Sequence, residues 1–214
     1  MQINEIRHAI KNIKTTTFGI SVPELKKFAK QIANEDYKEL LDNNRFETFD
    51  MKLLHAFVLG YARDDITTLL GYFERFVPYV NDWAVNDSLC QSFKIARKYP
   101  DIVWNYLMRY HNTAKEFESR IVSVMLLSHY LTDEYVAKVI KVLDKLNADE
   151  YYAQMGIAWA IATMAGKYPA LTLQYLQSDE CHLNRDTYNK SLRKITESLR
   201  ISDRMKETVK RLKK

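Results

Sequence analysis

The chain has 214 residues, a formal net charge of +5 and 47% hydrophobic residues, a content that excludes a disordered chain. It holds only five glycines and four prolines, which favours helices over hairpin turns and flexible linkers. Its two cysteines, Cys90 and Cys181, have no CxxC spacing and no clustered histidines, so the sequence indicates neither a disulfide framework nor a zinc site.

The sequence lacks the usual signals for secretion and membrane insertion. Its N-terminus has no apolar signal-peptide core, and no stretch reaches the roughly 18 apolar residues of a transmembrane helix. We therefore expect a cytoplasmic protein that does not enter the membrane. The length predicts a single domain over residues 1–214.

Apolar residues recur at helical spacing almost throughout, and no window alternates as a strand would. Breakers and capping residues divide the chain into helices at 4–13, 21–33, 35–43, 50–62, 64–76, 81–97, 100–109, 114–130, 132–146, 149–166, 169–177, 184–200 and 202–212. The predicted N-caps are Asp50, Asp64, Thr132, Asp149 and Ser202, and the first-turn prolines are Pro23, Pro100 and Pro169. An all-α chain follows.

An internal repeat gives these helices a period. The pattern A-x-K-Y-P-x5-Y-L begins at Ala96 and again at Ala165, an offset of 69 residues. This offset is close to twice a two-helix repeat of about 34 residues, as in known helical solenoids. The sequence therefore predicts an α-solenoid of antiparallel helix pairs whose concave cleft is the natural binding face.

Positive charge gathers at the C-terminal end. Residues 185–214 hold eleven Lys or Arg against four Asp or Glu, so the formal net charge of the rest of the chain is near −2. Such an end suits a polyanion, because phosphate contacts supply most non-specific affinity for nucleic acid. The alternative is a solvated face that serves solubility, since Lys and Arg also favour the C-terminal ends of helices.

Standard catalytic signatures are missing from the sequence. It has no Gly-rich phosphate loop, no HExxH and no GxSxG, and its five histidines share no ligand spacing. We therefore expect no metal and no cofactor.

Two tryptophan segments are unusual. Trp83 and Asp87 are related as i and i+4, which places an indole and a carboxylate on one helix face. Trp159 lies near the middle of another predicted long helix, and Arg120 begins the apolar part of a helix between them. Taken alone, tryptophan in helical repeats usually fills the core, and an aspartate near a helix N-terminus usually acts on the dipole.

The ordered set of these blocks resembles a known family. The segment 18–30 (FGISVPELKKFAK), Trp83-x3-Asp87, Arg120 and Ala158-Trp159 are similar to the DNA alkylation repair (AlkD-type) family of HEAT-like-repeat DNA glycosylases, over residues from about 18 to 200. The resemblance implies that two tryptophans and one aspartate line the concave cleft, contact the deoxyribose of a damaged nucleotide and leave its base stacked.

The matching positions give the implied roles. Asp87 would stabilise positive charge on the sugar and orient water, while Trp83 and Trp159 would shape the site. Arg120 would hold a backbone phosphate, and the basic residues Lys190, Arg193, Lys194 and Arg200 would grip the duplex. The expected partner is alkylated duplex DNA, bound by a monomer.

The N-terminus departs from the family pattern. About seventeen residues precede Gly19, room for one helix where the best-known catalytic members carry two, so we expect a branch with a shortened N-terminus. Two functions therefore remain open. The first is a DNA glycosylase that releases N3- or N7-alkylpurines without flipping the base. The second is a non-catalytic HEAT-like scaffold that binds DNA or a protein partner.

Overall fold

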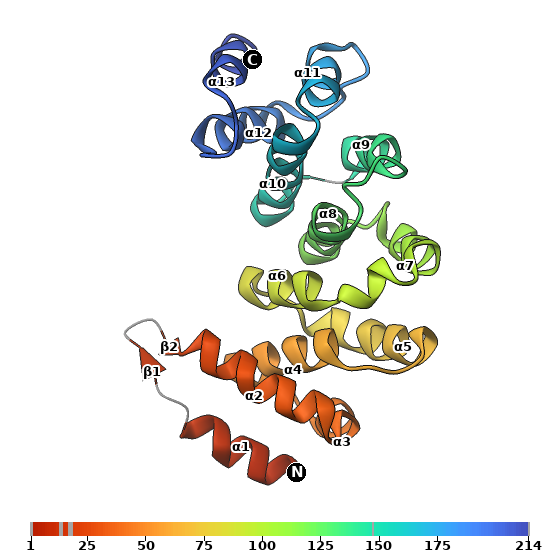
Figure 1. Ribbon diagram of the computed structural model, residues 1–214, viewed down its shortest axis with the longest axis vertical. Helices are drawn as coiled ribbons and strands as arrows, with labels where there is room; N and C mark the ends of the chain where they lie inside the picture. The colour runs from red at the N-terminus through yellow and green to blue at the C-terminus, as the bar shows by residue number, and fades with distance from the viewer. Residues whose placement is uncertain (1, 13–14, 17–18, 147, 214) are drawn as a thin grey trace. The chain divides into compact units, whose positions relative to one another are not determined.

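A computed structural model describes residues 2–12, 15–16, 19–146 and 148–213, and α-helices dominate them (Figure 1). The chain divides into two compact units, Met1–Tyr99 and Pro100–Lys214. The elements of the first unit are α1 (Ile3–Lys11), β1 (Thr15–Thr16), β2 (Gly19–Ile20), α2 (Val22–Asn34), α3 (Tyr37–Asn43), α4 (Phe49–Tyr61), α5 (Ile66–Phe76), η1 (Val77–Tyr79), α6 (Trp83–Ser92) and η2 (Lys94–Arg97).

The second unit is helical throughout its described residues. Its elements are α7 (Pro100–Leu107), η3 (Met108–Tyr110), α8 (Glu116–His129), α9 (Val136–Lys145), α10 (Tyr151–Lys167), α11 (Pro169–Gln177), α12 (Arg185–Glu197) and α13 (Asp203–Lys210). The all-α prediction is thus confirmed for nearly the whole described chain.

The prediction that the chain contains no strand was wrong at one place. β1 and β2 pair antiparallel, with Thr15 opposite Ile20 and Thr16 opposite Gly19. Each strand has only two residues, too few for an alternating pattern to be visible in the sequence, although the β-branched threonines favour extended backbone. Ile13 and Phe18, which the predictions included, lie outside the described residues.

Helix starts follow the prolines better than the predicted caps. Pro23 lies in the first turn of α2, and Pro100 and Pro169 open α7 and α11 as predicted. Ser202 caps α13, with its hydroxyl accepting from the backbone N–H of Met205. The other predicted caps are wrong, because the N-cap positions of α4, α5, α9 and α10 are Thr48, Asp65, Tyr135 and Glu150.

The predicted helix 81–97 is broken. α6 ends at Ser92, and Phe93 leaves the helical region with φ −74° and ψ 57° before the short 3₁₀ turn of η2. Ser92 also packs closely on α4, because a Cβ added to Gly60 would meet Cβ of Ser92 at 2.3 Å. A glycine is therefore required at this crossing.

Alternate helices pack against one another in each unit. In the first unit α4 lies between α2 and α6, and in the second α10 lies between α8 and α12. The crossing of α8 and α10 also places a glycine against a serine, since a Cβ on Gly156 would meet Oγ of Ser123 at 2.4 Å. These central helices are buried on most sides, which explains their long apolar sequences.

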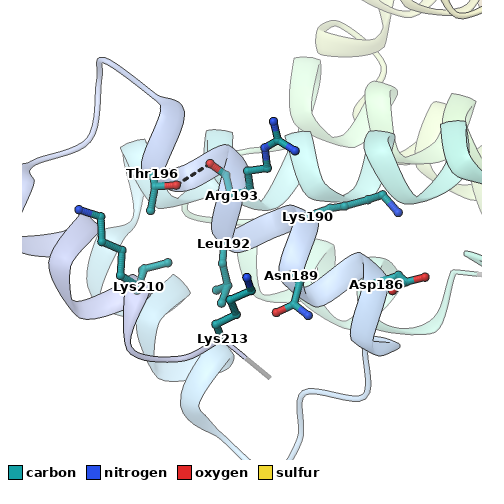
Figure 2. Close-up of a pocket in the computed structure, with 9 residues that line it drawn as sticks. Asp186, Asn189, Lys190, Leu192, Arg193, Thr196, Lys210 and Lys213 are labelled. Atoms are coloured by element: carbon teal, nitrogen blue, oxygen red, sulfur yellow. Dashed lines mark hydrogen bonds between the residues drawn. The ribbon is translucent and has the colours of Figure 1, made fainter.

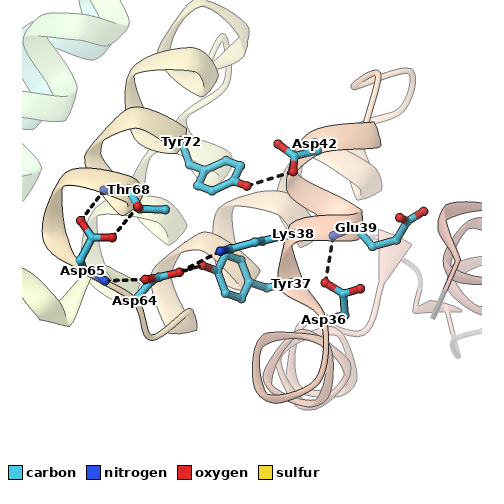
Figure 3. Close-up of polar contacts among 9 residues, drawn as sticks. All are labelled: Asp36, Tyr37, Lys38, Glu39, Asp42, Asp64, Asp65, Thr68 and Tyr72. Carbon is cyan, nitrogen blue, oxygen red and sulfur yellow. Dashed lines mark hydrogen bonds and ion pairs between the residues drawn. The ribbon is translucent and has the colours of Figure 1, made fainter.

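The intervening helices of the first unit are tied by tyrosine hydroxyls (Figure 3). Tyr72 of α5 donates to a carboxylate oxygen of Asp42 in α3 at 3.0 Å, and Tyr37 donates to Asp64. The hydrogen bond from Tyr37 is the main reason that the pKa of Asp64 falls to about 2. Lys38 lies 3.3 Å from the same carboxylate.

The second unit repeats this arrangement along α7, α9 and α11. Tyr135 donates to Asp101, Tyr168 donates to Asp133 at 2.7 Å, and Tyr175 donates to Asp144 at 2.7 Å. The partners are 34, 35 and 31 residues apart in sequence. Each bond therefore joins elements about one helix pair apart in the sequence.

Candidate nucleic-acid interface

Trp83 and Asp87 lie on α6 in the first unit. Asp82 caps this helix by accepting from the backbone N–H of Ala84 at 2.7 Å, which fixes Trp83 as its first residue. Trp83 is 50% exposed, whereas Asp87, one turn later, is 8% exposed. The indole is thus open to a ligand, and most of the Asp87 side chain is covered by protein.

Arg120 lies on α8 in the second unit and is buried. Its Nη1 donates to the carbonyl oxygen of Tyr152 at 2.9 Å, and Glu116, one turn earlier, accepts from the backbone N–H of Tyr152 at 2.6 Å. Two side chains of α8 therefore hold the backbone at the start of α10. The contact between the Arg120 guanidinium, which has five N–H donors, and a DNA phosphate remains a prediction.

Trp159 lies in the middle of α10 and lines a groove of about 790 Å³. Within the helix, Thr163 donates its hydroxyl to the backbone carbonyl oxygen of Trp159 at 2.8 Å. Two of the predicted DNA contacts, Lys194 and Arg200, line the same groove from α12 and the turn after it. The fold thus brings Trp159 and these two cations from separate parts of the sequence into one groove, whose lining also includes Lys167 and Glu197.

Lys190 and Arg193 lie further along α12. The Lys190 ammonium is 5.5 Å from the ring centroid of Tyr151 and donates to the side-chain oxygen of Gln154. Arg193 donates from Nε to Glu197 at 2.7 Å, and that hydrogen bond raises the pKa of the guanidinium. Both basic residues line a second cleft, between α12 and α13 (Figure 2).

Sequence reasoning missed an aromatic surface at the start of α10. Tyr151 is 55% exposed and Tyr152 is 36% exposed, and the Tyr152 ring stacks on Phe117 with centroids 5.6 Å apart. The sequence carried part of the signal, because Tyr152 and Trp159 are related as i and i+7 and so lie on one side of α10, but this spacing does not tell whether that side is exposed. Exposed rings beside lysines are typical of surfaces on which nucleic-acid bases stack.

The described part of the chain contains neither a metal-binding cluster nor a helix that could span a membrane. Among the described residues, no cluster of three or more His, Cys, Asp or Glu side chains could hold a metal ion. The helices described here are also each too short or too polar to cross a lipid bilayer.

The fold and the site define a predominantly helical protein with an indole and cations in one groove and further cations in a neighbouring cleft. Residues 2–195 match the family model described as DNA alkylation repair enzyme, and the chain belongs to that family. The match reaches into the last turn of α12 and leaves α13 outside. No curated protein and no solved structure gives a significant match.

The predicted site residues fall in both compact units. Trp83 and Asp87 belong to the first unit, and Trp159 and all five predicted DNA contacts belong to the second. Within the second unit, one groove joins Trp159 to Lys194 and Arg200. The roles assigned to these residues remain predictions.

Proposed function

We propose that this chain is a monofunctional DNA glycosylase that acts in base excision repair and releases N3- or N7-alkylpurines from duplex DNA without flipping the base. The observation that carries the proposal is the match to the DNA alkylation repair enzyme family over residues 2–195. The groove that joins Trp159 to two cations supports DNA as the ligand.

Cleavage of the glycosidic bond of an alkylated purine needs little acid catalysis from the protein. Alkylation at N3 or N7 makes the purine cationic, so the base is already a good leaving group. The sugar then passes through an oxocarbenium-like transition state that carries positive charge. The protein has to stabilise that charge and position water, and a hydrolysis of this kind needs neither metal nor cofactor.

Asp87 is the residue proposed to stabilise the sugar cation. An ionised carboxylate acts most strongly where water is excluded, and Asp87 is largely covered by protein. It would also orient the attacking water. Its place one turn after the exposed Trp83 supports a pairing of carboxylate and indole on α6.

Trp83 and Trp159 are proposed to shape the site around the sugar. An indole presents an electron-rich face to a cation, and such contacts are worth about 0.5–2 kcal/mol. Trp83 is half exposed and Trp159 lines an open groove, so each has surface to offer a ligand. Their flat rings would also exclude water from the leaving base.

Cations of the second unit are proposed to hold the phosphates. Lys194 and Arg200 do so beside Trp159, and Lys190 and Arg193 extend the contact along α12. Arg120 is proposed to hold a phosphate near the lesion.

The finer architecture belongs to the same proposal. We propose that the helix pairs form a single HEAT-like α-solenoid over residues 1–214, monomeric, with a concave cleft for the duplex. The regular spacing of the Tyr135–Asp101, Tyr168–Asp133 and Tyr175–Asp144 bonds supports a helical repeat.

Base release tests the proposed activity. Purified protein incubated with duplex DNA that contains N7-methylguanine should release the free base, measured by chromatography. Asp87→Asn should lower the rate by about 10²–10³-fold, as for loss of one electrostatic stabiliser. Asp179→Asn is the control, because it makes the same change at an exposed carboxylate in the turn after α11, which lines neither the groove nor the cleft, and it should release base at the wild-type rate. Absence of release by the wild type at high protein concentration would refute the proposal.

A second candidate function is a non-catalytic helical-repeat scaffold that binds DNA or a protein partner. The burial of Asp87 and Arg120 favours it, because a ligand must reach both side chains for the catalytic roles. Such a scaffold would bind undamaged duplex in a salt-dependent way and release no base. Binding that does not respond to salt would indicate a protein partner instead.

A further inference from the structure

The cleft between α12 and α13 concentrates positive charge. It has a volume of about 420 Å³, and four of the residues that line it are cationic: Lys190 and Arg193 from α12, and Lys210 and Lys213 from the C-terminal end. One carboxylate, that of Asp186, lines the cleft with them. The lining therefore carries an excess of positive charge that favours an anionic ligand.

Two of the four cations of this cleft, Arg193 and Lys210, are held by exposed ion pairs and are therefore available to a ligand. Arg193 pairs with Glu197 at 2.7 Å and Lys210 pairs with Glu207 at 2.5 Å, within their own helices. Both glutamates are about half exposed, and exposed pairs of this kind contribute little stability. Phosphate oxygens can therefore replace the carboxylates at small cost.

The arrangement of the four side chains fits an extended ligand better than a single ion. In Figure 2 the Lys190, Arg193 and Lys210 side chains extend in different directions from the cleft and do not converge on one point. The lining residues Leu192 and Val209 are buried, so the cleft offers a ligand mainly its polar and charged side chains. A site for one phosphate ion would instead gather its donors around one position.

We propose that the α12–α13 cleft binds successive phosphates of a nucleic-acid backbone, with Lys210 and Lys213 as contacts beyond the region that matches the family. This inference rests on the proposed function for its choice of ligand, and it extends the DNA-contacting surface past α12 onto α13. Inorganic polyphosphate offers the same chemistry, a run of phosphates on a flexible chain, and serves as the competing probe.

The measurement is the salt dependence of binding to an undamaged duplex, followed by fluorescence anisotropy with the full-length protein. Lysine contacts to phosphate each add about 0.9 to the slope of log K against log salt. The double variant Lys210→Gln/Lys213→Gln should therefore lower the slope by about 2 and bind more weakly at low salt. Both lysines are exposed, and circular dichroism should show an unchanged helix content.

The matched control is Lys141→Gln/Lys145→Gln. These lysines are exposed on α9 of the same unit and line neither the groove nor the cleft, so this variant removes the same charge elsewhere. It should keep the wild-type slope. An equal fall in slope for both double variants would show that only the net charge matters, and this would overturn the proposal. An unchanged slope for Lys210→Gln/Lys213→Gln would also overturn it.

Polyphosphate separates the two possible sources of phosphate. Under the proposal, polyphosphate competes for the protein more weakly than duplex of equal phosphate content. It competes more weakly still for the Lys210→Gln/Lys213→Gln variant. Tight polyphosphate binding that depends on Lys210 and Lys213, with duplex binding unaffected by them, would overturn the assignment to nucleic acid. Base release is a separate readout: a protein that releases no base but shows the expected fall in slope would contradict the glycosylase and support the cleft.

Discussion

Gly60→Ala should destabilise the protein through one helix crossing. Gly60 lies in the last turn of α4, where an added methyl group would lie 2.3 Å from Cβ and 2.9 Å from the carbonyl carbon of Ser92. Ordinary contact begins near 3.4 Å, so α4 and α6 would have to separate locally by about 1 Å. Rotation of a side chain cannot relieve this clash, because one of the atoms belongs to the backbone.

The expected size of the effect follows from two opposing terms. Overpacking of a helix interface costs about 1–3 kcal/mol, while replacing glycine by alanine in a helix contributes about 0.5–1 kcal/mol of stability. The free energy of unfolding should therefore fall by about 1–2 kcal/mol, which lowers the melting temperature by about 2–8 °C in a chain of this size. The same displacement would move α6, which carries Trp83 and Asp87.

Gly71→Ala is the matched comparison, because Gly71 is an exposed helical glycine in α5 with open space where the Cβ would go. Thermal and urea unfolding followed by circular dichroism should show Gly71→Ala slightly stabilised and Gly60→Ala clearly destabilised. Ser92→Gly should restore part of the stability lost in Gly60→Ala, since it removes the nearest atom. Equal stabilisation by both alanines would refute the close packing of α4 on α6.

Two further predictions concern buried polar groups. Burial lowers the pKa of His55 to about 3, so between about pH 6.5 and 3 the unfolded chain binds more protons than the folded one, and the free energy of unfolding falls as the pH falls, on the order of 1 kcal/mol per unit. Urea unfolding between about pH 7 and 5 should show this slope, which His55→Leu should remove; a slope that survives the substitution would contradict the assignment. Tyr175→Phe deletes the hydroxyl that donates to Asp144 and should cost about 1–2 kcal/mol in thermal unfolding. An unchanged melting temperature would show that this bond contributes nothing.

The helices could be predicted from the sequence because their cause is local. Apolar spacing located every α-helix of the described chain, and proline fixed the starts of α7 and α11 because its ring presets the first-turn backbone. The caps were less predictable, because several acidic residues compete for each helix start. Asp64 was predicted to cap α5, but its carboxylate accepts from Tyr37, and Asp65 accepts from Thr68 at 2.9 Å instead.

The environment of the candidate site could not be predicted from the sequence, since burial depends on distant elements. The i, i+4 relation of Trp83 and Asp87 is visible in the sequence, but the contrast between an open indole and a covered carboxylate is not. In the same way, Lys194 and Trp159 are 35 residues apart, and only the packing of α12 on α10 brings them to one groove. The aromatic surface at Tyr151 and Tyr152 was missed because a tyrosine pair fits a core as well as a surface.

Arg120, which was predicted to bind a phosphate, also holds the start of α10 in place. The N-cap residue of α10, Glu150, makes no side-chain capping bond, so the first N–H groups of that helix depend on neighbours. Glu116 of α8 accepts the Tyr152 N–H at 2.6 Å, and its negative charge also favours the positive end of the α10 dipole. Arg120 then holds the carbonyl of the same residue at 2.9 Å. Because Tyr152 and Trp159 are separated by two helical turns, this pair of bonds fixes the helix that presents the indole to its groove. Loss of Arg120 would therefore disturb the site even without a phosphate contact.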